Sequence, residues 1–170
     1  MTVKSQSPLS LVHVDDLIGK LQGELIRPGD PRYDEARRVW NGMIDRRPAL
    51  IARCREVTDV VACVRFAADH NLLLAVRGGG HNVAGFGTCD GGLVIDLSLM
   101  RGINVDSQRR TARAEGGATW ADLDRETQVF GLAAPGGLVS TTGIAGLTLG
   151  GGQGWLRRTY GKPPQRVVDT

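Results

Sequence analysis

One short stretch of the chain combines a tight turn with side chains that could act on a ligand. Gly78–Gly80 follow an apolar run at residues 72–76 and come directly before His81 and Asn82. Consecutive glycines remove every Cβ, so backbone N–H groups can approach a bound anion closely and positive φ values are permitted. Arg77 is expected at the mouth of the turn as a cation, with His81 and Asn82 as the first side chains to reach a ligand. The stretch suggests a site for a dinucleotide pyrophosphate.

The same turn is also consistent with a purely structural role. It is neither a Gly-x-Gly-x-x-Gly motif that opens a helix nor a phosphate-binding loop with a Lys-Ser/Thr pair. A histidine in such a loop is most often solvated or hydrogen bonded. Taken alone, the turn leaves the structural and the ligand-binding interpretations open.

A second glycine-rich stretch, residues 135–154, favours the ligand-binding interpretation. It mixes glycine with hydroxyl and apolar side chains, which suits a backbone wrapped around a flat ligand. Ser140, Thr141 and Thr142 can cap a helix that begins near Gly143 and can donate to ligand oxygens. The alternative is a buried loop whose small residues allow close packing. Two such stretches in one chain together favour a large cofactor.

Composition limits the classes of protein that the chain can belong to. Its 170 residues fit one domain with a sizeable core, and 41% hydrophobic content indicates a folded globular protein. Of the 24 glycines, 18 lie between Gly78 and Gly152, so they mark particular loops. The net charge is +3, and the arginines are scattered without a basic run. Nucleic-acid binding is therefore not supported.

The cysteines and the N-terminus bear on the compartment. Cys54, Cys63 and Cys89 are odd in number and contain no Cys-x-x-Cys pair, which argues against a disulfide framework and against a metal site. Residues 1–10 lack the pattern of a signal peptide, and no apolar run approaches the about 18 residues that a membrane span needs. We expect a cytoplasmic protein with no membrane partner.

The elements around the first turn form a predicted strand–helix–strand unit. Residues 49–52 and 72–76 have the composition of buried strands, and the helix between them is expected to run from an N-cap at Thr58 to about His70. Strands joined by a helix over so short a distance should be parallel. The glycine turn then lies at the carboxyl end of the second strand, where open α/β sheets bind ligands.

Weaker patterns predict the remaining elements. They are, in chain order, short helices within residues 9–21 and 33–40, a strand at 93–97, and hairpin strands at 103–106 and 111–115. Thr119 should cap a helix that begins at Trp120 and ends before Gly131.

The two glycine-rich stretches and their flanks together resemble a known family. The first reads Arg-Gly-Gly-Gly-His-Asn-Val-Ala-Gly and is followed by Cys-Asp-Gly-Gly-Leu-Val-Ile-Asp-Leu-Ser; the second contains Thr-Gly-Ile-Ala-Gly-Leu-Thr-Leu-Gly-Gly-Gly. In this order they resemble the FAD-binding domain of the berberine-bridge-enzyme-like oxidases, in the vanillyl-alcohol-oxidase superfamily. The resemblance covers about residues 50–161. It implies an α+β, PCMH-type fold, in which a small α/β subdomain with the βαβ unit is joined to part of a second α+β subdomain.

The resemblance also implies which residues bind FAD. The pyrophosphate would lie on Arg77, Gly78, Gly79, Gly80, His81, Asn82 and Val83. The isoalloxazine and ribityl groups would be lined by Pro135, Gly136, Ser140, Thr141, Gly143, Gly146 and Gly151. His81 aligns with the histidine that, in this family, bonds covalently to the flavin 8α-methyl group, which suits a neutral imidazole. A second link from a cysteine to flavin C6 is not expected, because Val139 stands at that position.

By the same resemblance, the chain divides into an N-terminal helical segment, residues 1–45, and an FAD-binding PCMH-type domain, residues 46–170, incomplete at its C-terminal end. Family members continue into a substrate domain that carries the catalytic base. This chain instead ends with residues 162–170, where Pro163-Pro164 cannot continue a helix or a central strand. We therefore expect a truncated sequence that contains no catalytic residue.

The implied function is that of an FAD-dependent oxidoreductase. A hydride would pass from a small organic substrate to the flavin, with O2 as the acceptor. The alternative is a truncated, non-catalytic FAD-binding fragment without the substrate domain. A nicotinamide-binding Rossmann domain is a weaker hypothesis, because no helix follows the glycine turn and the nearest acid, Asp96, ends its own strand.

Overall fold

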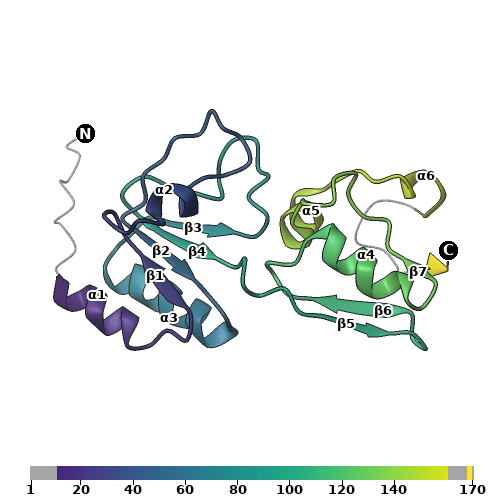
Figure 1. The fold of residues 1–170 in the computed structure, drawn as a ribbon, viewed down its shortest axis with the longest axis horizontal. Coiled ribbons are helices and arrows are strands. Elements are labelled where there is room, and N and C mark those ends of the chain that lie inside the picture. Colours follow the sequence, from purple (N-terminus) through teal and green to yellow (C-terminus); the bar gives the residue numbers. More distant parts are fainter. Residues whose placement is uncertain (1–10, 161–167, 170) are drawn as a thin grey trace.

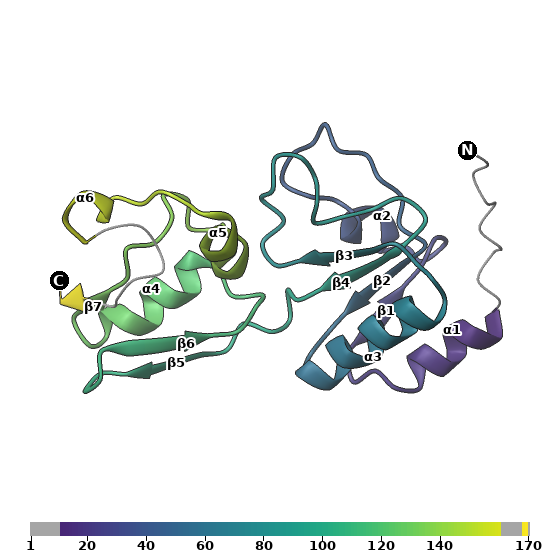
Figure 2. The same cartoon turned by 180° about the vertical axis from the view of Figure 1, so that it is seen from behind.

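The computed structural model describes residues 11–160 and 168–169, which form two lobes (Figures 1 and 2). The first lobe contains the elements from α1 to β4, and the second contains those from β5 to β8. The chain passes from one lobe to the other after β4. The mixture of helices and sheets has the expected α+β character. The expectations for residues 1–10 and for the segment from 162 to 167 concern parts outside the described residues.

A four-stranded sheet forms the core of the first lobe. Its strands, in spatial order, are β1 (Glu24–Ile26), β2 (Leu50–Arg53), β4 (Leu93–Asp96) and β3 (Leu74–Arg77). β2 and β3 share one direction, as expected, but β4 lies between them and pairs in parallel with both. Because β4 is central, Leu93, Val94 and Ile95 are all fully buried, which explains their continuous apolar run.

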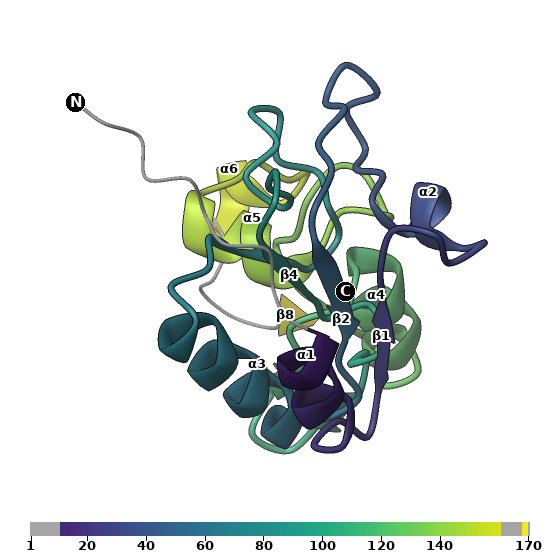
Figure 3. The same cartoon turned by 90° about the vertical axis from the view of Figure 1, so that its left-hand side faces the viewer.

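Helices cover both faces of this sheet. On one face α3 (Val57–Asp69) and α1 (Leu11–Ile18) lie side by side, as Figure 3 shows. On the other face lies α2 (Tyr33–Ala36), with the buried Tyr33 ring in one cluster with Ile51. Successive strand residues point to opposite faces, so each face buries its own apolar cluster.

Helix α3 begins before the expected cap. Its N-cap is Glu56, whose backbone is extended with φ of −148°. Thr58 lies inside the helix and donates its hydroxyl to Glu56 Oε1 at 2.7 Å. The prediction of Thr58 as the cap was wrong, because that hydroxyl bonds a nearby carboxylate. The next residue, Asp59, is fully buried and accepts the backbone N–H groups of Gln22 and Gly23, which fixes the chain before β1.

A hairpin and one helix form the centre of the second lobe. These elements are β5 (Ile103–Asp106), β6 (Thr111–Ala114) and α4 (Trp120–Gln128). Thr119 caps α4 in a capping box with Asp122, as the sequence indicated. Burial acts to raise the pKa of Asp122, but hydrogen bonds from Arg101 and Thr119 outweigh it and lower that pKa to about 2.

The rest of the second lobe consists of short elements. They are β7 (Leu132–Ala133), α5 (Ile144–Gly150), α6 (Arg157–Tyr160) and β8 (Val168–Asp169). Helix α5 begins where expected, but its N-cap is Gly143, without a side-chain cap. The prediction that Ser140, Thr141 or Thr142 caps it was wrong. The segment before α5 is held instead through its backbone, since the Ser140 and Thr142 carbonyls accept N–H groups from the start of α4.

The described residues add two observations that bear on membranes and metals. No helix among them combines the length and the apolar character that crossing a bilayer requires. In the same part of the chain, no three His, Cys, Asp or Glu side chains gather as they would around a metal ion. Cys54, Cys63 and Cys89 are buried and free. A cytoplasmic location stays a prediction.

Candidate functional site

A cleft of about 570 Å³ lies at the carboxyl ends of the parallel strands in the first lobe. This is the position expected for a ligand in an open α/β sheet, and the volume is within the range of small-molecule sites. The cleft is lined by the first turn, by strand ends, by the segment around α2 and by one residue of the second lobe. The lining residues are Ile26, Arg32, Glu35, Ala36, Arg38, Val39, Trp40, Arg53, Arg77, Gly78, Gly79, Gly80, His81, Asp96, Ser98 and Thr141.

The glycines of the first turn are required by contacts between the two lobes. A Cβ on Gly79 would lie 2.3 Å from the backbone nitrogen of Gly143, and one on Gly78 would lie 2.8 Å from the carbonyl oxygen of Gly116. Gly80 has a positive φ of 70°, a conformation that favours glycine. The two glycine-rich stretches therefore meet, with Gly79 and Gly143 in backbone contact.

The turn also presents free backbone donors. The N–H groups of Gly79, Gly80 and His81 donate to no acceptor within the part of the chain that the structure describes. Successive free N–H groups beside a cleft favour an anionic ligand. The same turn thus serves both as a structural contact and as a candidate site for phosphate.

His81 is contacted on three sides. Its ring stacks on the Trp40 indole, with a centroid distance of 5.4 Å and an interplanar angle of 20°. Nε2 lies 3.1 Å from Thr141 Oγ1, and Nδ1 lies 3.5 Å from Thr142 Oγ1. A neutral imidazole can satisfy both hydroxyls, because one ring nitrogen donates and the other accepts. These contacts fix the orientation of the imidazole at the cleft.

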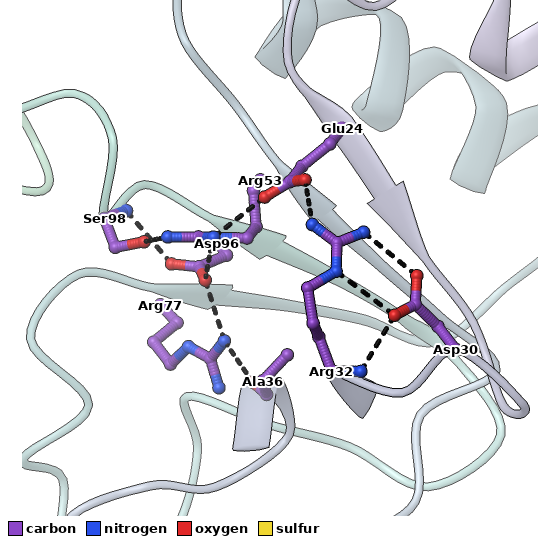
Figure 4. Close-up of polar contacts among 8 residues, drawn as sticks. All are labelled: Glu24, Asp30, Arg32, Ala36, Arg53, Arg77, Asp96 and Ser98. Carbon is purple, nitrogen blue, oxygen red and sulfur yellow. Dashed lines mark hydrogen bonds and ion pairs between the residues drawn. The ribbon is translucent and has the colours of Figure 1, made fainter. Parts of the chain in front are cut away.

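Arg77 lies inside the protein and not at the mouth of the turn. Its side chain is only 7% exposed, and its guanidinium is 2.9 Å from Asp96 Oδ2. The same group donates to the carbonyl oxygens of Ala36, at 2.6 Å, and Arg38, at 3.0 Å. Figure 4 shows Arg77 reaching between Asp96 and Ala36. The prediction of Arg77 as a cation at the mouth of the turn is therefore wrong, because pairing of β3 with β4 places Asp96 opposite Arg77.

A chain of ion pairs continues from Asp96 along the ends of the strands (Figure 4). Arg53 lies 3.7 Å from Asp96 and 2.8 Å from Glu24. Arg32 pairs with both Glu24 and Asp30. The hydrogen bond from Arg32 is the largest of the effects that lower the pKa of Glu24. The guanidinium groups of Arg32 and Arg53 are therefore both paired with carboxylates.

Asn82 and Val83 stabilise the loop that follows the turn. Asn82 Oδ1 accepts the Phe86 N–H at 3.1 Å, and the Val83 carbonyl accepts from Asn41 Nδ2 at 2.8 Å. Of the set predicted to bind pyrophosphate, Arg77 and Gly78–His81 line the cleft, whereas Asn82 and Val83 lie beyond its lining.

Two predicted residues of the second stretch reach the turn. Thr141 lines the cleft, and Gly143 contacts Gly79. The other members of that set lie outside the cleft lining: Pro135, Gly136, Ser140, Gly146 and Gly151. A Cβ on Gly136 would lie 2.4 Å from the Trp120 ring, whereas one on Gly146 or Gly151 would meet nothing within 4 Å. Their contacts with a flavin stay predictions.

Sequence reasoning missed the segment that precedes the first buried strand. Arg38 and Trp40 line the cleft, and β1 joins the sheet antiparallel to β2. Nothing in residues 36–40 signals a site, because the segment has no motif and only a short helix. Arg53 and Asp96 could have been found, since both end parallel strands, where ligands bind.

Comparisons with known proteins identify the class of ligand. The family profile described as an FAD binding domain matches residues 48–169. (R)-6-Hydroxynicotine oxidase of Paenarthrobacter nicotinovorans is 43% identical over 168 residues, which are 99% of this chain and 34% of that protein. An FAD-linked oxidoreductase of Dictyostelium discoideum is 41% identical over 156 residues, 91% of this chain and 34% of that protein.

Solved structures support the same assignment. The crystal structure of 6-hydroxy-D-nicotine oxidase from Arthrobacter nicotinovorans matches with a TM-score of 0.81 at 45% identity, covering 84% of this chain and 31% of that one. BBE-like 1 of Physcomitrella patens matches with a TM-score of 0.78 at 26% identity, covering 88% and 33%. This chain thus spans about a third of the length of the relatives it matches. The resemblance to the berberine-bridge-like oxidases, the PCMH-type fold and FAD as the cofactor are confirmed. The chain belongs to the family of FAD-binding domains found in FAD-linked oxidoreductases.

Proposed function

We propose that the cleft of the first lobe binds the FAD of an oxidoreductase, with the pyrophosphate on the turn Gly78–His81. The observation that carries this proposal is the set of free N–H groups at Gly79, Gly80 and His81, beside the cleft of a chain from an FAD-binding family. Backbone donors of this kind match phosphate oxygens. The residues present therefore fit the cofactor.

The other predicted contacts form two sets. Asn82 and Val83 extend the pyrophosphate contacts beyond the turn, and Arg77 supports the turn through its buried ion pair. The residues proposed to line the flavin ring and ribityl chain are Pro135, Gly136, Ser140, Thr141, Gly143, Gly146 and Gly151. The placement of Thr141 and Gly143 against the first turn supports this second set.

We assign covalent attachment of FAD to His81. A neutral imidazole nitrogen is a nucleophile, and the His81 ring is presented at the cleft in one orientation by Trp40 and the second lobe. Each ring nitrogen also has a threonine hydroxyl nearby. A threonine hydroxyl can therefore accept a hydrogen bond from the protonated ring nitrogen and leave the other nitrogen as the neutral nucleophile.

FAD would supply the redox chemistry by accepting a hydride from a small organic substrate and passing the electrons to O2. The part of this chain is to bind and orient the cofactor, and we assign no catalytic residue to it. The relative that is 43% identical is named for (R)-6-hydroxynicotine. We propose a substrate of similarly small size.

A second candidate function is FAD binding without turnover by this chain alone. It is favoured by length, because the chain spans 34% of each of the two relatives compared. Both candidates share the same cleft and cofactor. They differ in whether bound flavin is bleached when a substrate is added without O2.

The first experiment asks whether flavin stays with the denatured polypeptide. The chain is expressed, its visible spectrum is recorded, and flavin fluorescence is followed on a denaturing gel. We expect fluorescence in the unaltered chain and in the control His70→Ala, and none in His81→Ala. His70 suits this control because it is the C-cap of α3 and is not part of the cleft lining.

Other outcomes separate the parts of the proposal. Flavin that leaves the unaltered chain on denaturation would contradict covalent attachment and preserve FAD binding. A colourless protein that takes up no added FAD would contradict the proposed function of this chain.

A further inference from the structure

Four arginines line the cleft, and three of them already have anionic partners. Arg32, Arg53 and Arg77 each form at least one ion pair with a carboxylate. Figure 4 shows these three guanidinium groups directed at carboxylates of the chain itself. Because each charge is balanced by a neighbouring carboxylate, none of the three is left to attract a phosphate.

Arg38 is the fourth of these arginines. It is exposed, and its guanidinium makes no hydrogen bond or ion pair with the residues that the structure describes. Its charge is felt by Asp34, but the pKa of that carboxyl is lowered mainly by a hydrogen bond from Arg37 and least by Arg38. Within the described part of the chain, a full positive charge at the cleft therefore lacks a partner.

The backbone around Arg38 is bonded to the Arg77 side chain and to the glycine turn that follows Arg77. The Arg77 guanidinium donates to the Ala36 carbonyl oxygen at 2.6 Å and to the Arg38 carbonyl oxygen at 3.0 Å. After it, the Trp40 N–H donates to the Gly80 carbonyl at 3.1 Å. These bonds hold Arg38 next to the free N–H groups of the turn.

We propose that Arg38 is the side chain that binds the phosphates of FAD, and that Arg77 is a positioning residue acting through the backbone at Arg38. This inference rests on the proposed function and adds a residue outside the segment 48–169 that the family profile matches. A guanidinium is suited to the role, because its planar donors match phosphate oxygens in pairs. Phosphate thereby completes a site whose other donors are the backbone N–H groups of the turn.

The test compares ligands with and without phosphate in the 170-residue chain. Affinity for FAD and for riboflavin is measured by fluorescence titration in four proteins that all carry His81→Ala, so that binding is reversible. They are His81→Ala alone and His81→Ala combined with Arg38→Gln, Arg38→Lys or Arg65→Gln. We expect Arg38→Gln to weaken FAD binding by about 10- to 100-fold, the effect of one charge-assisted hydrogen bond. Riboflavin should bind equally to all four proteins, and Arg38→Lys should recover part of the FAD affinity.

Arg65→Gln is the matched control. Arg65 is an exposed arginine on α3, and it is not part of the cleft lining. The substitution removes the same charge from the protein and should leave FAD affinity unchanged. Equal FAD affinity of Arg38→Gln and Arg65→Gln would overturn the role of Arg38. An equal loss of FAD and riboflavin in Arg38→Gln would overturn it too, since it would indicate damage to the fold.

Inorganic pyrophosphate is a second probe, followed by the amide NMR shifts of Gly79 and Gly80. If the unaltered chain binds pyrophosphate and Arg38→Gln does not, the inference is supported, whether or not the chain takes up FAD. A chain that takes up no FAD would contradict the proposed function. An FAD affinity that Arg38→Gln leaves unchanged would overturn only the inference. Failure to bind either probe would overturn both.

Discussion

The two glycine-rich stretches look alike in sequence, but their glycines are not packed to the same extent. In the first, Gly78 and Gly79 lie against backbone atoms of the second lobe, and Gly80 needs a positive φ. In the second, a Cβ would lie within 3 Å of other atoms at five glycines and would meet nothing within 4 Å at Gly146, Gly150 and Gly151. The five closely packed positions are Gly136, Gly137, Gly143, Gly152 and Gly154. Glycine density alone therefore does not distinguish a close backbone contact from an open surface. The first stretch is packed at its turn, whereas the second combines closely packed glycines with open positions in and directly after α5.

The arginines around the first stretch show the same division between structure and ligand. Arg77 adjoins the glycines in sequence, and its guanidinium pairs with Asp96 and donates to two backbone carbonyl oxygens. Arg38 is 39 residues earlier in the chain than Arg77 and remains without a partner among the described residues. Proximity in sequence thus indicated Arg77, which stabilises the turn. Only the fold showed that Arg38, without a partner among the described residues, also lies at the cleft.

The largest expected effect comes from breaking the buried pair behind the first stretch. Arg77→Met should lower the free energy of unfolding by about 3–5 kcal/mol, because it leaves Asp96 buried without its closest cation. Urea unfolding measures the loss. Arg38→Gln is the control, and as a surface change it should stay within about 0.5 kcal/mol. A loss below about 1 kcal/mol for Arg77→Met would indicate a solvated cation instead of a structural one.

A smaller effect is expected from the contact between the two stretches. Gly79→Ala should lower the free energy of unfolding by about 3 kcal/mol. The new Cβ would lie 2.3 Å from the Gly143 nitrogen, and the atoms nearest to it all belong to the backbone. Gly42→Ala is the matched control, since a Cβ there meets nothing within 4 Å. Thermal unfolding of the two variants compares them directly. Similar stabilities would show that the lobes separate easily at this contact.

The smallest effect should have the opposite sign and falls in the second stretch. Gly146 lies within α5 and has open space around a Cβ. Gly146→Ala should therefore stabilise the chain by about 0.5–1 kcal/mol, the difference in helix propensity between the two residues. Chemical unfolding measures this gain. A destabilised variant would mean that Gly146 is packed as closely as Gly79, and the contrast between the stretches would disappear.

Most strands of the first lobe could be predicted, because a run of apolar residues within each strand identifies it. The apolar runs identified β2, β3 and β4 to within two residues, and Thr119 with Asp122 identified the start of α4. The cap at Thr58 failed, because a hydroxyl can bond a neighbouring carboxylate as readily as a helix N–H. The position of β4 between β2 and β3 is a pairing choice, and no residue within the strands encodes it.

The candidate site could be predicted in its backbone and only partly in its side chains. The turn Gly78–His81 lies at the carboxyl end of β3, as expected, and lines the cleft. The partner of Arg77 depends on the register of β3 with β4, and the neighbours of His81 come from residues 40, 141 and 142. Such contacts join positions far apart in the chain, so no spacing in the sequence reports them.

The local elements, the two glycine-rich stretches and the FAD-binding family could all be predicted before the fold was known, because turn chemistry, apolar periodicity and motif order are properties of neighbouring residues. Which arginines form ion pairs, and which lack a partner among the described residues, depends on the three-dimensional arrangement of the strands and loops. That outcome depends on β4 lying beside β3, which gives Arg77 a buried carboxylate, and on the segment at Arg38 packing on the turn. A guanidinium beside a carboxylate is neutralised, whereas one without a partner retains its charge for a ligand.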